Sequence, residues 1–496
     1  MKVWHFLGVC LLLLASSSAR PEVSETDYFA VFMEGKKVGY AIQSRVVAET
    51  KVRTTINMNV TVSRLGFPIT VNTTETHIET IDGKPLGFEL VQELSGIPMR
   101  VTGTVNEQGS INITAASMGA EQKSTLDWPS GALMAEGLRL LQLKKGVKQG
   151  STYTAKVFAP SMLQAIDARI QIGPKRNVDL LGRVVALTEV TTAMTMPMVG
   201  EIVSTSYVDD ELRMQKTVMP MMGMQIEMVA CAKEFALGQN DVLELINKMF
   251  LPSPVPLEKV GSAKAIAYRL VPIGDANSPM IPSTDNQSVR LGKDGIIVVT
   301  VEPVAAPAGA RFAYKGKDKA ILEAAKPTRF LQSDDKRIIK LARRAIGRTK
   351  DAAEAAKRIE AFVAKYIDNK NLSVGYASAV EVAASRQGDC TEHAVLTAAM
   401  CRAIGIPAQV VTGVAYVDDF AGLRGFGGHA WAQAYVGGKW VGLDAAFKGT
   451  ERGGYDAGHI ALAVGNGNPE DFFVLAKILG QFKIDKVMVT KKGGSI

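Results

Sequence analysis

The first half of the chain alternates apolar and polar residues in short runs. Between residues 27 and 236 these runs are separated by turn signals that contain glycine, and clear examples lie at 27–32, 55–62, 88–94 and 183–192. A period of two is typical of strands that bury one face, and such turns connect antiparallel neighbours. The pattern therefore predicts a large antiparallel β-rich region with one helical interruption near residues 130–143.

Three prolines, Pro252, Pro254 and Pro256, then interrupt the pattern. Closely spaced prolines stiffen a chain and are typical of a linker. A second, smaller β-rich stretch follows at about residues 260–304. We therefore expect an accessory β-rich domain at 20–250 and a smaller β-rich linking region at 251–330.

Beyond residue 330 the apolar positions follow the period of a helix. Ser333 is placed to cap a helix that ends at Ile346, before Gly347. Apolar residues at 359, 362, 363, 366 and 367 predict a second helix, and residues 379–386 predict a short one. The stretch 390–404 is apolar on nearly every face, so it predicts a buried helix.

Predicted strands follow at residues 408–417, 429–436 and 439–443. A buried helix packed on an antiparallel sheet gives residues 331–496 an α+β architecture, and with the β-rich regions before them the whole chain is expected to be α+β. Residues 418–428 contain four glycines and are predicted to form a loop. That loop either gates access of a substrate or is an ordinary surface connection.

Composition places the chain among ordinary globular proteins of several domains. Its 496 residues are 47% hydrophobic and 21% charged, and the net charge of +8 is spread along the sequence. Nucleic-acid-binding proteins usually concentrate Lys and Arg in a stripe with interleaved aromatic residues. No such stripe is present, so we expect no nucleic-acid partner.

The first residues have the layout of a secretory signal peptide. Lys2 precedes an apolar run at residues 6–15, and Ser17-Ser18-Ala19 offers small residues for cleavage. The run is shorter than the roughly 20 residues that a membrane span needs. We expect residues 1–19 to be removed and the mature protein to be exported, periplasmic or extracellular, and not an integral membrane protein.

Three cysteines remain after residue 19, namely Cys231, Cys390 and Cys401. Cys390 and Cys401 lie on the same predicted helix, which separates them by about 16 Å. A disulfide requires Cα atoms within about 7 Å, so these two cannot pair. At least one free thiol is therefore expected in an oxidising compartment. A free thiol in such a compartment suggests that the cysteine has a chemical function.

Cys390 has the surroundings of a nucleophile. It opens the buried helix, where backbone N–H groups and the helix dipole stabilise a thiolate. A cysteine nucleophile also needs a base and a group that orients the base. The dipeptide Gly437-Gly438 predicts a two-residue hairpin turn, which places His429 and Asp444 as diagonal neighbours on one face, roughly 7 Å apart.

Four motifs together resemble the core of the transglutaminase-like superfamily. They are residues 388–394 (GDCTEHA), 401–408 (CRAIGIPA), 429–431 (HAW) and 440–444 (WVGLD), with His459-Ile460 further on. The resemblance covers about residues 333–480, around a third of the chain. It implies a papain-like α+β core at 331–496, with Cys390 as nucleophile, His429 as base and acid and Asp444 as the orienting group. Ala445 stands where many relatives carry proline.

Other interpretations of these residues remain open. Cys390 could be a buried structural thiol, or Cys390, His393, His429 and Asp444 could together hold zinc. His393 could replace His429 as the base, although we favour a structural role because no orienting partner is evident. Asp389 and Glu392 most simply cap the helix. We expect no metal and no cofactor.

The sequence thus predicts an exported cysteine enzyme that transfers an acyl group through a thioester on Cys390. If water is the acceptor, the enzyme is a peptidase or amidase, which we favour. If an amine is the acceptor, it is a cross-linking transglutaminase. A protein or peptide, or other cell-envelope material, would be the partner. The alternative from another class is a non-catalytic binding or scaffold protein of the cell envelope.

Overall fold

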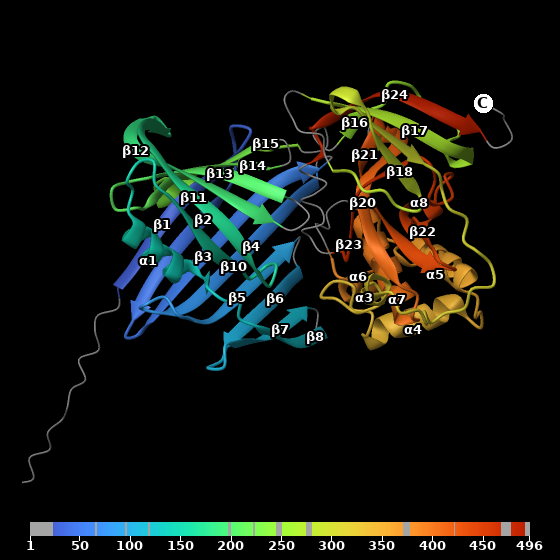
Figure 1. Ribbon diagram of the computed structural model, residues 1–496, viewed down its shortest axis with the longest axis horizontal. Coiled ribbons are helices and arrows are strands. Elements are labelled where there is room, and N and C mark those ends of the chain that lie inside the picture. Colours follow the sequence, from blue (N-terminus) through green and yellow to red (C-terminus); the bar gives the residue numbers. More distant parts are fainter. Residues whose placement is uncertain are drawn as a thin grey trace, which may run out of the picture.

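The computed structural model describes residues 23–491, except 65–66, 95–96, 118–119, 197–199, 222–223, 245–249, 274–279, 371–376, 421 and 468–477. The predicted signal peptide at residues 1–19 lies outside the described residues. Figure 1 shows a part built almost wholly of strands beside a C-terminal part that holds most of the helices. Among the described residues, no helix combines the length and the apolar character that crossing a membrane requires.

A single 15-stranded sheet accounts for the predicted β-rich region. Its strands pair in the order β8-β7-β6-β5-β4-β3-β2-β1-β15-β14-β13-β12-β11-β10-β9. The strands of its first arm are β1 (Val23–Met33), β2 (Lys36–Ala48), β3 (Lys51–Arg64), β4 (Phe67–Thr80), β5 (Pro85–Leu94), β6 (Ile97–Val105), β7 (Ser110–Ser117) and β8 (Ala120–Asp127). Those of its second arm are β9 (Ala132–Leu133), β10 (Thr152–Ala159), β11 (Gln164–Leu180), β12 (Arg183–Met196), β13 (Gly200–Val208), β14 (Met214–Met221) and β15 (Met224–Ala230).

The pairing is antiparallel except between β9 and β10, so the prediction of a large antiparallel sheet is confirmed. Along β11 the buried residues Ile166, Ala168 and Ile170 alternate with exposed ones, as the period of two requires. The pairing of β1 with β15 joins the two arms into one sheet.

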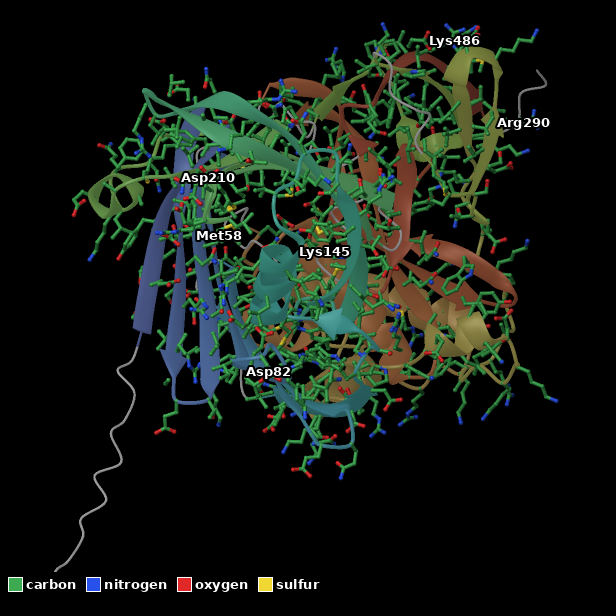
Figure 2. All side chains as sticks on the ribbon, turned by 60° about the vertical axis from the view of Figure 1, so that its left-hand side comes forward. Met58, Asp82, Lys145, Asp210, Arg290 and Lys486 are labelled. Atoms are coloured by element: carbon green, nitrogen blue, oxygen red, sulfur yellow. The ribbon has the colours of Figure 1, made fainter. Side chains whose placement is uncertain are left out.

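Helix α1 (Ala135–Lys145) is the predicted helical interruption, and it lies between the two arms, where Figure 2 labels Lys145. Its N-cap residue, Met134, offers no side-chain hydrogen bond. Instead the carboxylate of Glu79, on β4, accepts hydrogen bonds from the backbone N–H groups of Glu136 and Gly137 at 2.6 and 3.0 Å. A distant strand therefore supplies the acceptor that the start of this helix needs.

The stretch between the large sheet and the predicted core contributes strands to two other sheets. After α2 (Lys233–Ala236), strand β16 (Phe250–Pro252) pairs with β21 (Leu423–Val436). Strands β17 (Ala263–Pro272), β18 (Gln287–Leu291) and β19 (Ile297–Val301) form a four-stranded sheet in the order β18-β19-β17-β24, which includes β24 (Phe482–Lys491) near the C-terminus.

Among the described residues, the C-terminal part contains the helices α3 (Lys319–Glu323), α4 (Lys336–Ile346), α5 (Ala352–Tyr366), α6 (Ala379–Ser385), α7 (Cys390–Ala403) and α8 (Ala445–Lys448). The cap predicted at Ser333 is wrong, because α4 starts later and Asp335 accepts the hydrogen bond from Arg337 N–H. The cap predicted at the start of α7 is confirmed, since Asp389 and Glu392 form a reciprocal capping box.

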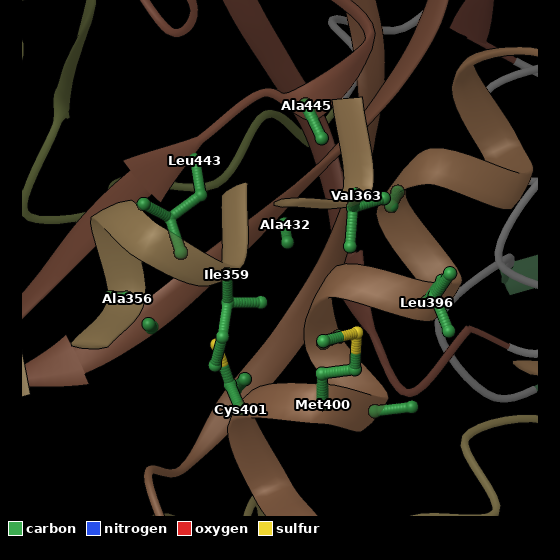
Figure 3. Close-up of a cluster of buried hydrophobic side chains, with 14 of the residues drawn as sticks. Ala356, Ile359, Val363, Leu396, Met400, Cys401, Ala432, Leu443 and Ala445 are labelled. Carbon is green, nitrogen blue, oxygen red and sulfur yellow. The ribbon is translucent and has the colours of Figure 1, made fainter. Parts of the chain in front are cut away.

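Helix α7 is buried against an antiparallel sheet. The sheet has the order β16-β21-β20-β23, with β22 paired to β21, and comprises β20 (Ala408–Phe420), β21, β22 (Lys439–Leu443) and β23 (His459–Gly465) besides β16. Figure 3 shows the core between α7, α5 and the sheet, formed by side chains that include Ile359, Val363, Leu396, Met400, Ala432 and Leu443. The C-terminal part therefore mixes α and β structure as predicted.

The loop predicted at residues 418–428 is wrong. Most of these residues continue β20 and β21, and β16 pairs with Gly425 and Gly427. A Cβ atom on Gly425 would lie 2.4 Å from the carbonyl oxygen of Leu251, and the residue has φ +147°. The glycines therefore permit a close approach of β16 rather than forming a gate.

Candidate active site

His429 and Asp444 are brought together by the hairpin of β21 and β22. Val436 pairs with Lys439 across the turn at Gly437-Gly438, and this register is the predicted one. His429 lies on β21, and Asp444 directly follows β22 as the N-cap of α8. The two side chains meet, with Nε2 of His429 2.9 Å from Oδ2 of Asp444.

The hydrogen-bond partners of Asp444 determine its charge. Oδ1 accepts from the backbone N–H groups of Ala446 and Phe447, and Oδ2 accepts from His429 and from His459 at 3.0 Å. Burial alone would raise the pKa of Asp444, but the charges and hydrogen bonds of the two histidines hold that pKa well below its usual range. The buried carboxylate is therefore ionised at neutral pH.

The tautomer of His429 follows from its partner. A carboxylate can only accept a hydrogen bond, so Nε2 of His429 carries the hydrogen that it donates to Asp444. In the neutral ring Nδ1 then has a free lone pair and can act as a base. The ring of Phe447 lies nearly parallel to the imidazole, with centroids 4.4 Å apart, and helps to hold it in place.

Cys390 is the first residue of α7 and is half-buried. Helix α7 packs against β21, the strand that carries His429, and against α8, which follows Asp444. Gly388 precedes it with φ +144°, where a Cβ atom would lie within 2.4 Å of the Glu392 side chain. Glycine at this position therefore allows the chain to turn tightly into the capping box of α7.

His393 lies one turn beyond Cys390 and is buried. Its Nδ1 donates to the backbone carbonyl of Asp389 at 2.6 Å, while its Nε2 has no hydrogen-bond partner among the described residues. Burial lowers the pKa of His393, so the ring is neutral. Its Nδ1–H is held by a backbone carbonyl, whereas the Nε2–H of His429 is held by a carboxylate.

The side chains that lie close enough together to share a metal ion are not the four that the sequence suggested as zinc ligands. Within the described chain, His429, Asp444 and His459 have ligand atoms within 4.8 Å of one another, and neither Cys390 nor His393 joins them. The sequence indicates His459 only through the family resemblance. It starts β23, and its pairing with Ala415, which in turn pairs with Gly427, brings it near His429.

Comparison with known proteins finds a family model that matches part of the chain. Residues 339–445 match the model of the transglutaminase-like superfamily, a range that includes Cys390, His429 and Asp444. No curated protein matches the chain. One similar solved structure is a candidate cysteine protease from Cytophaga hutchinsonii, with 19% identity, a TM-score of 0.29 and coverage of 46% of this chain and 83% of that chain.

A second similar structure is a β-barrel-like protein from Brucella abortus, from a domain family of unknown function. It has 12% identity and a TM-score of 0.31, and the match covers 43% of this chain and 98% of that one.

Proposed function

Since residues 339–445 form a transglutaminase-like domain, we propose that the protein is a cysteine enzyme that transfers an acyl group through a thioester on Cys390. His429 is the base and acid, and Asp444 orients it. The observation that carries the proposal is the buried 2.9 Å hydrogen bond between His429 and Asp444, which leaves Nδ1 as a base on the strand against which α7 packs. The helix and sheet around this pair would correspond to the core of papain-like enzymes.

Each step of the reaction uses one of these groups. Nδ1 of His429 accepts the proton of the Cys390 thiol, and the thiolate attacks the carbonyl carbon of an amide. The backbone N–H of Cys390, at the start of α7, is placed to donate to the oxyanion. The protonated His429 then gives its proton to the leaving amine, and a thioester remains. Water, deprotonated by His429, attacks the thioester and releases a carboxylic acid and the free thiol.

Water is the acceptor that we rank first, which makes the enzyme a peptidase or amidase. Transfer to an amine, as in protein cross-linking, needs in addition a site that binds the amine and keeps water out. Incubating the enzyme with casein and a fluorescent primary amine separates the two acceptors. New peptide termini without fluorescence in the protein would support hydrolysis, whereas fluorescence that exceeds cleavage would reverse the ranking.

The nucleophile can be tested without a substrate. Iodoacetamide should alkylate Cys390 below pH 8.5, the usual pKa of a free thiol being about 8.5. The two other cysteines of the mature chain are internal controls, because burial raises the pKa of Cys231 and raises that of Cys401 to about 12. Intact-mass and peptide mass spectrometry of residues 20–496 identify the alkylated site.

The base is tested by two variants in the same assay. His429→Ala should slow the alkylation of Cys390 below pH 8, and His393→Asn should leave it unchanged. A Cys390 that reacts no faster than Cys231 would contradict the proposed nucleophile. A rate that falls in the His393 variant instead would assign the role of base to His393.

We further propose that residues 1–19 are a signal peptide and that the mature protein is periplasmic or extracellular. The layout of the first residues supports this proposal, and mass spectrometry of the mature N-terminus, expected at Arg20, tests it.

We also propose that the mature chain divides into a β-rich accessory domain at 20–250, a linking region at 251–330 and a core at 331–496. Limited proteolysis that cuts first near these boundaries would support it.

A second function, ligand binding, is favoured for the large sheet by a cavity of about 640 Å³ between its arms and α1, a size that suits a small molecule. Its lining includes the cationic side chains of Arg45 and Arg139 and the apolar side chains of Ile172 and Val190. An amphiphilic molecule would match both kinds of side chain. Val190→Trp should weaken binding of the amphiphilic dye anilinonaphthalene sulfonate, while the exposed Val184→Trp should not; equal binding would contradict this function.

A further inference from the structure

The carboxylate of Asp444 is shared by two imidazoles. Its Oδ2 lies 2.9 Å from Nε2 of His429 and 3.0 Å from Nε2 of His459. Since Oδ2 can only accept, both rings donate to it. The centroids of the two rings are 5.6 Å apart, and the side chain of His459 is fully buried. The proposed reaction uses only one of these two histidines.

The other nitrogen of His459 also faces acceptors. Its Nδ1 lies 3.0 Å from the backbone carbonyl oxygen of Asp456 and 3.1 Å from Oδ1 of the same residue. The backbone N–H of Asp456 also points at Nδ1, at 3.3 Å, and would donate to an unprotonated Nδ1, but the two acceptor oxygens are closer. Nδ1 therefore carries a hydrogen too, and a ring with hydrogens on both nitrogens is an imidazolium cation.

The charged groups around His459 agree with a cation. Asp444 and Asp456 are its two anionic neighbours, and Arg452 pairs with Asp456 on the far side. The rings of Trp431, Phe447 and Tyr455 surround it, and the two titratable rings in contact are those of His429 and Tyr455; burial raises the pKa of the Tyr455 phenol, which stays neutral. Burial alone would lower the pKa of His459, but the hydrogen bonds to Asp444 and Asp456 outweigh it and raise that pKa.

We propose that His459 is a positioning residue of the candidate active site, an imidazolium held between Asp444 and Asp456 that aims Oδ2 of Asp444 at His429 and offsets part of its negative charge. This inference rests on the proposed function of Cys390 and His429. Without His459, the full charge of Asp444 would stabilise the protonated form of His429, and one restraint on the rotation of the carboxylate would be lost.

The same three side chains do not suffice for a structural zinc site. Structural zinc sites use four ligands, and the described residues provide three, His429, Asp444 and His459. The second oxygen of Asp444 is occupied by the N–H groups of Ala446 and Phe447. Hydrogen bonds from these N–H groups and from the two imidazoles thus occupy both oxygens of this carboxylate without an ion.

Nuclear magnetic resonance can read the protonation of His459 directly. Only four of the five histidines remain after residue 19, so the long-range ¹H–¹⁵N spectra of residues 20–496 can be assigned with single variants. We expect both ring nitrogens of His459 to stay protonated from pH 5.5 to pH 8. A His459 that loses a proton near the usual value of about 6.5 would overturn the inference.

Two variants separate charge from position. His459→Gln keeps a donor for Asp444 but removes the charge, so the titration midpoint of His429 should rise by about one pH unit. Asp456→Asn should weaken the cation and shift the midpoint in the same direction by less. An unchanged midpoint in both variants would overturn the inference, as would one zinc ion per chain that is retained on dialysis and lost in His459→Gln.

Measuring the alkylation of Cys390 in the same samples distinguishes a failure of the proposed function from a failure of the role proposed for His459. If wild-type Cys390 reacts no faster than Cys231, the proposed function fails whatever His459 does. If wild-type Cys390 reacts fast and the midpoint of His429 does not move in either variant, the function stands and the role of His459 fails.

Discussion

The rings of His429 and Phe447 lie nearly parallel, at 13° with centroids 4.4 Å apart, and Phe447 follows Asp444 by only three residues. The backbone N–H of Phe447 donates to the carboxylate of Asp444. The first turn of α8 therefore brings two groups into contact with His429, the carboxylate of Asp444 and the ring of Phe447. The guanidinium of Arg452 also lies over the ring of Phe447, 4.3 Å from the ring centroid. One short helix therefore fixes two of the contacts that define the position of the imidazole.

We expect Phe447→Leu to reduce the rate of Cys390 alkylation at pH 7 about fivefold, because a stacked ring pair contributes about 1 kcal/mol beyond its buried area. Phe447→Tyr keeps the ring and is the matched control, for which the rate should stay near that of the wild type. Thermal melting of both variants shows whether the fold is intact. Equal rates in the two variants would mean that the stacked ring does not position His429.

Asp444→Asn should leave the fold intact and remove most of the activity. Asparagine is as good an N-cap as aspartate, so α8 should persist. Its amide would no longer fix the hydrogen of His429 on Nε2, and comparable changes in triads lower kcat by about 10⁴. The rate of amide hydrolysis, followed with a peptide substrate, is the measurement.

The matched control is Asp335→Asn, because Asp335 is also an N-cap aspartate with a lowered pKa, caused first by the side chain of Arg337. Its variant should hydrolyse the substrate at the wild-type rate. A loss of activity in Asp335→Asn similar to that in Asp444→Asn would show that the effect comes from helix stability and not from the orientation of His429.

The features that sequence alone predicted are those that local pattern encodes. The Gly437-Gly438 turn, with φ of +58° and +87°, fixes the register of β21 and β22 and so predicts that His429 and Asp444 are neighbours. The run of apolar residues after Cys390 predicts the buried helix α7, which the structure contains. In both cases the information lies within about 20 residues of chain.

The features that the sequence did not predict depend on pairing between distant segments. His459 reaches Asp444 because β23 pairs with β20, and nothing in its local sequence indicates that strand order. Glycine-rich residues near Gly425 resemble a loop until β16, about 170 residues earlier in the chain, pairs with them. Periodicity identifies an element and its buried face, but it carries no signal for which element becomes its partner.

Gly388→Ala should distort the start of α7. The new Cβ would lie 2.3 Å from Cγ of Glu392, and φ at this position is +144°, which disfavours any residue with a side chain. We expect a loss of about 1–3 kcal/mol in the free energy of unfolding, from the strained backbone, and slower alkylation of Cys390. Denaturant unfolding and intact mass measure the two effects.

The control for this substitution is Gly427→Ala, because Gly427 has no positive φ and its new Cβ would meet only the ring of Phe250 at 3.5 Å. It should change neither quantity appreciably. If Gly388→Ala reacts with iodoacetamide as fast as the wild type, the tight turn before Cys390 is not required to present the thiol.

The ionised side chain of Glu136 is expected to stabilise the large sheet and α1, and to make that stability depend on pH in the acid range. This buried carboxylate accepts hydrogen bonds from Arg45 and Arg139. Burial alone would raise the pKa of Glu136, but the two arginines lower it from 4.5 to about 2. A folded-state pKa below the unfolded one stabilises the fold above about pH 4.5, and that stabilisation is lost as the pH falls from 4.5 to 2.

We therefore expect Glu136→Gln to melt several degrees below the wild type at pH 7 and the gap to narrow steadily between pH 4.5 and pH 2. Glu201→Gln is the control, because Glu201 pairs with Arg169 at an exposed position on the same sheet, where an ion pair contributes less than about 1 kcal/mol. Its melting temperature should follow the wild type at every pH. A gap for Glu136→Gln that stays constant down to pH 2 would mean that the lost packing or hydrogen bonds, and not the ionised carboxylate, stabilise the contact between α1 and β2.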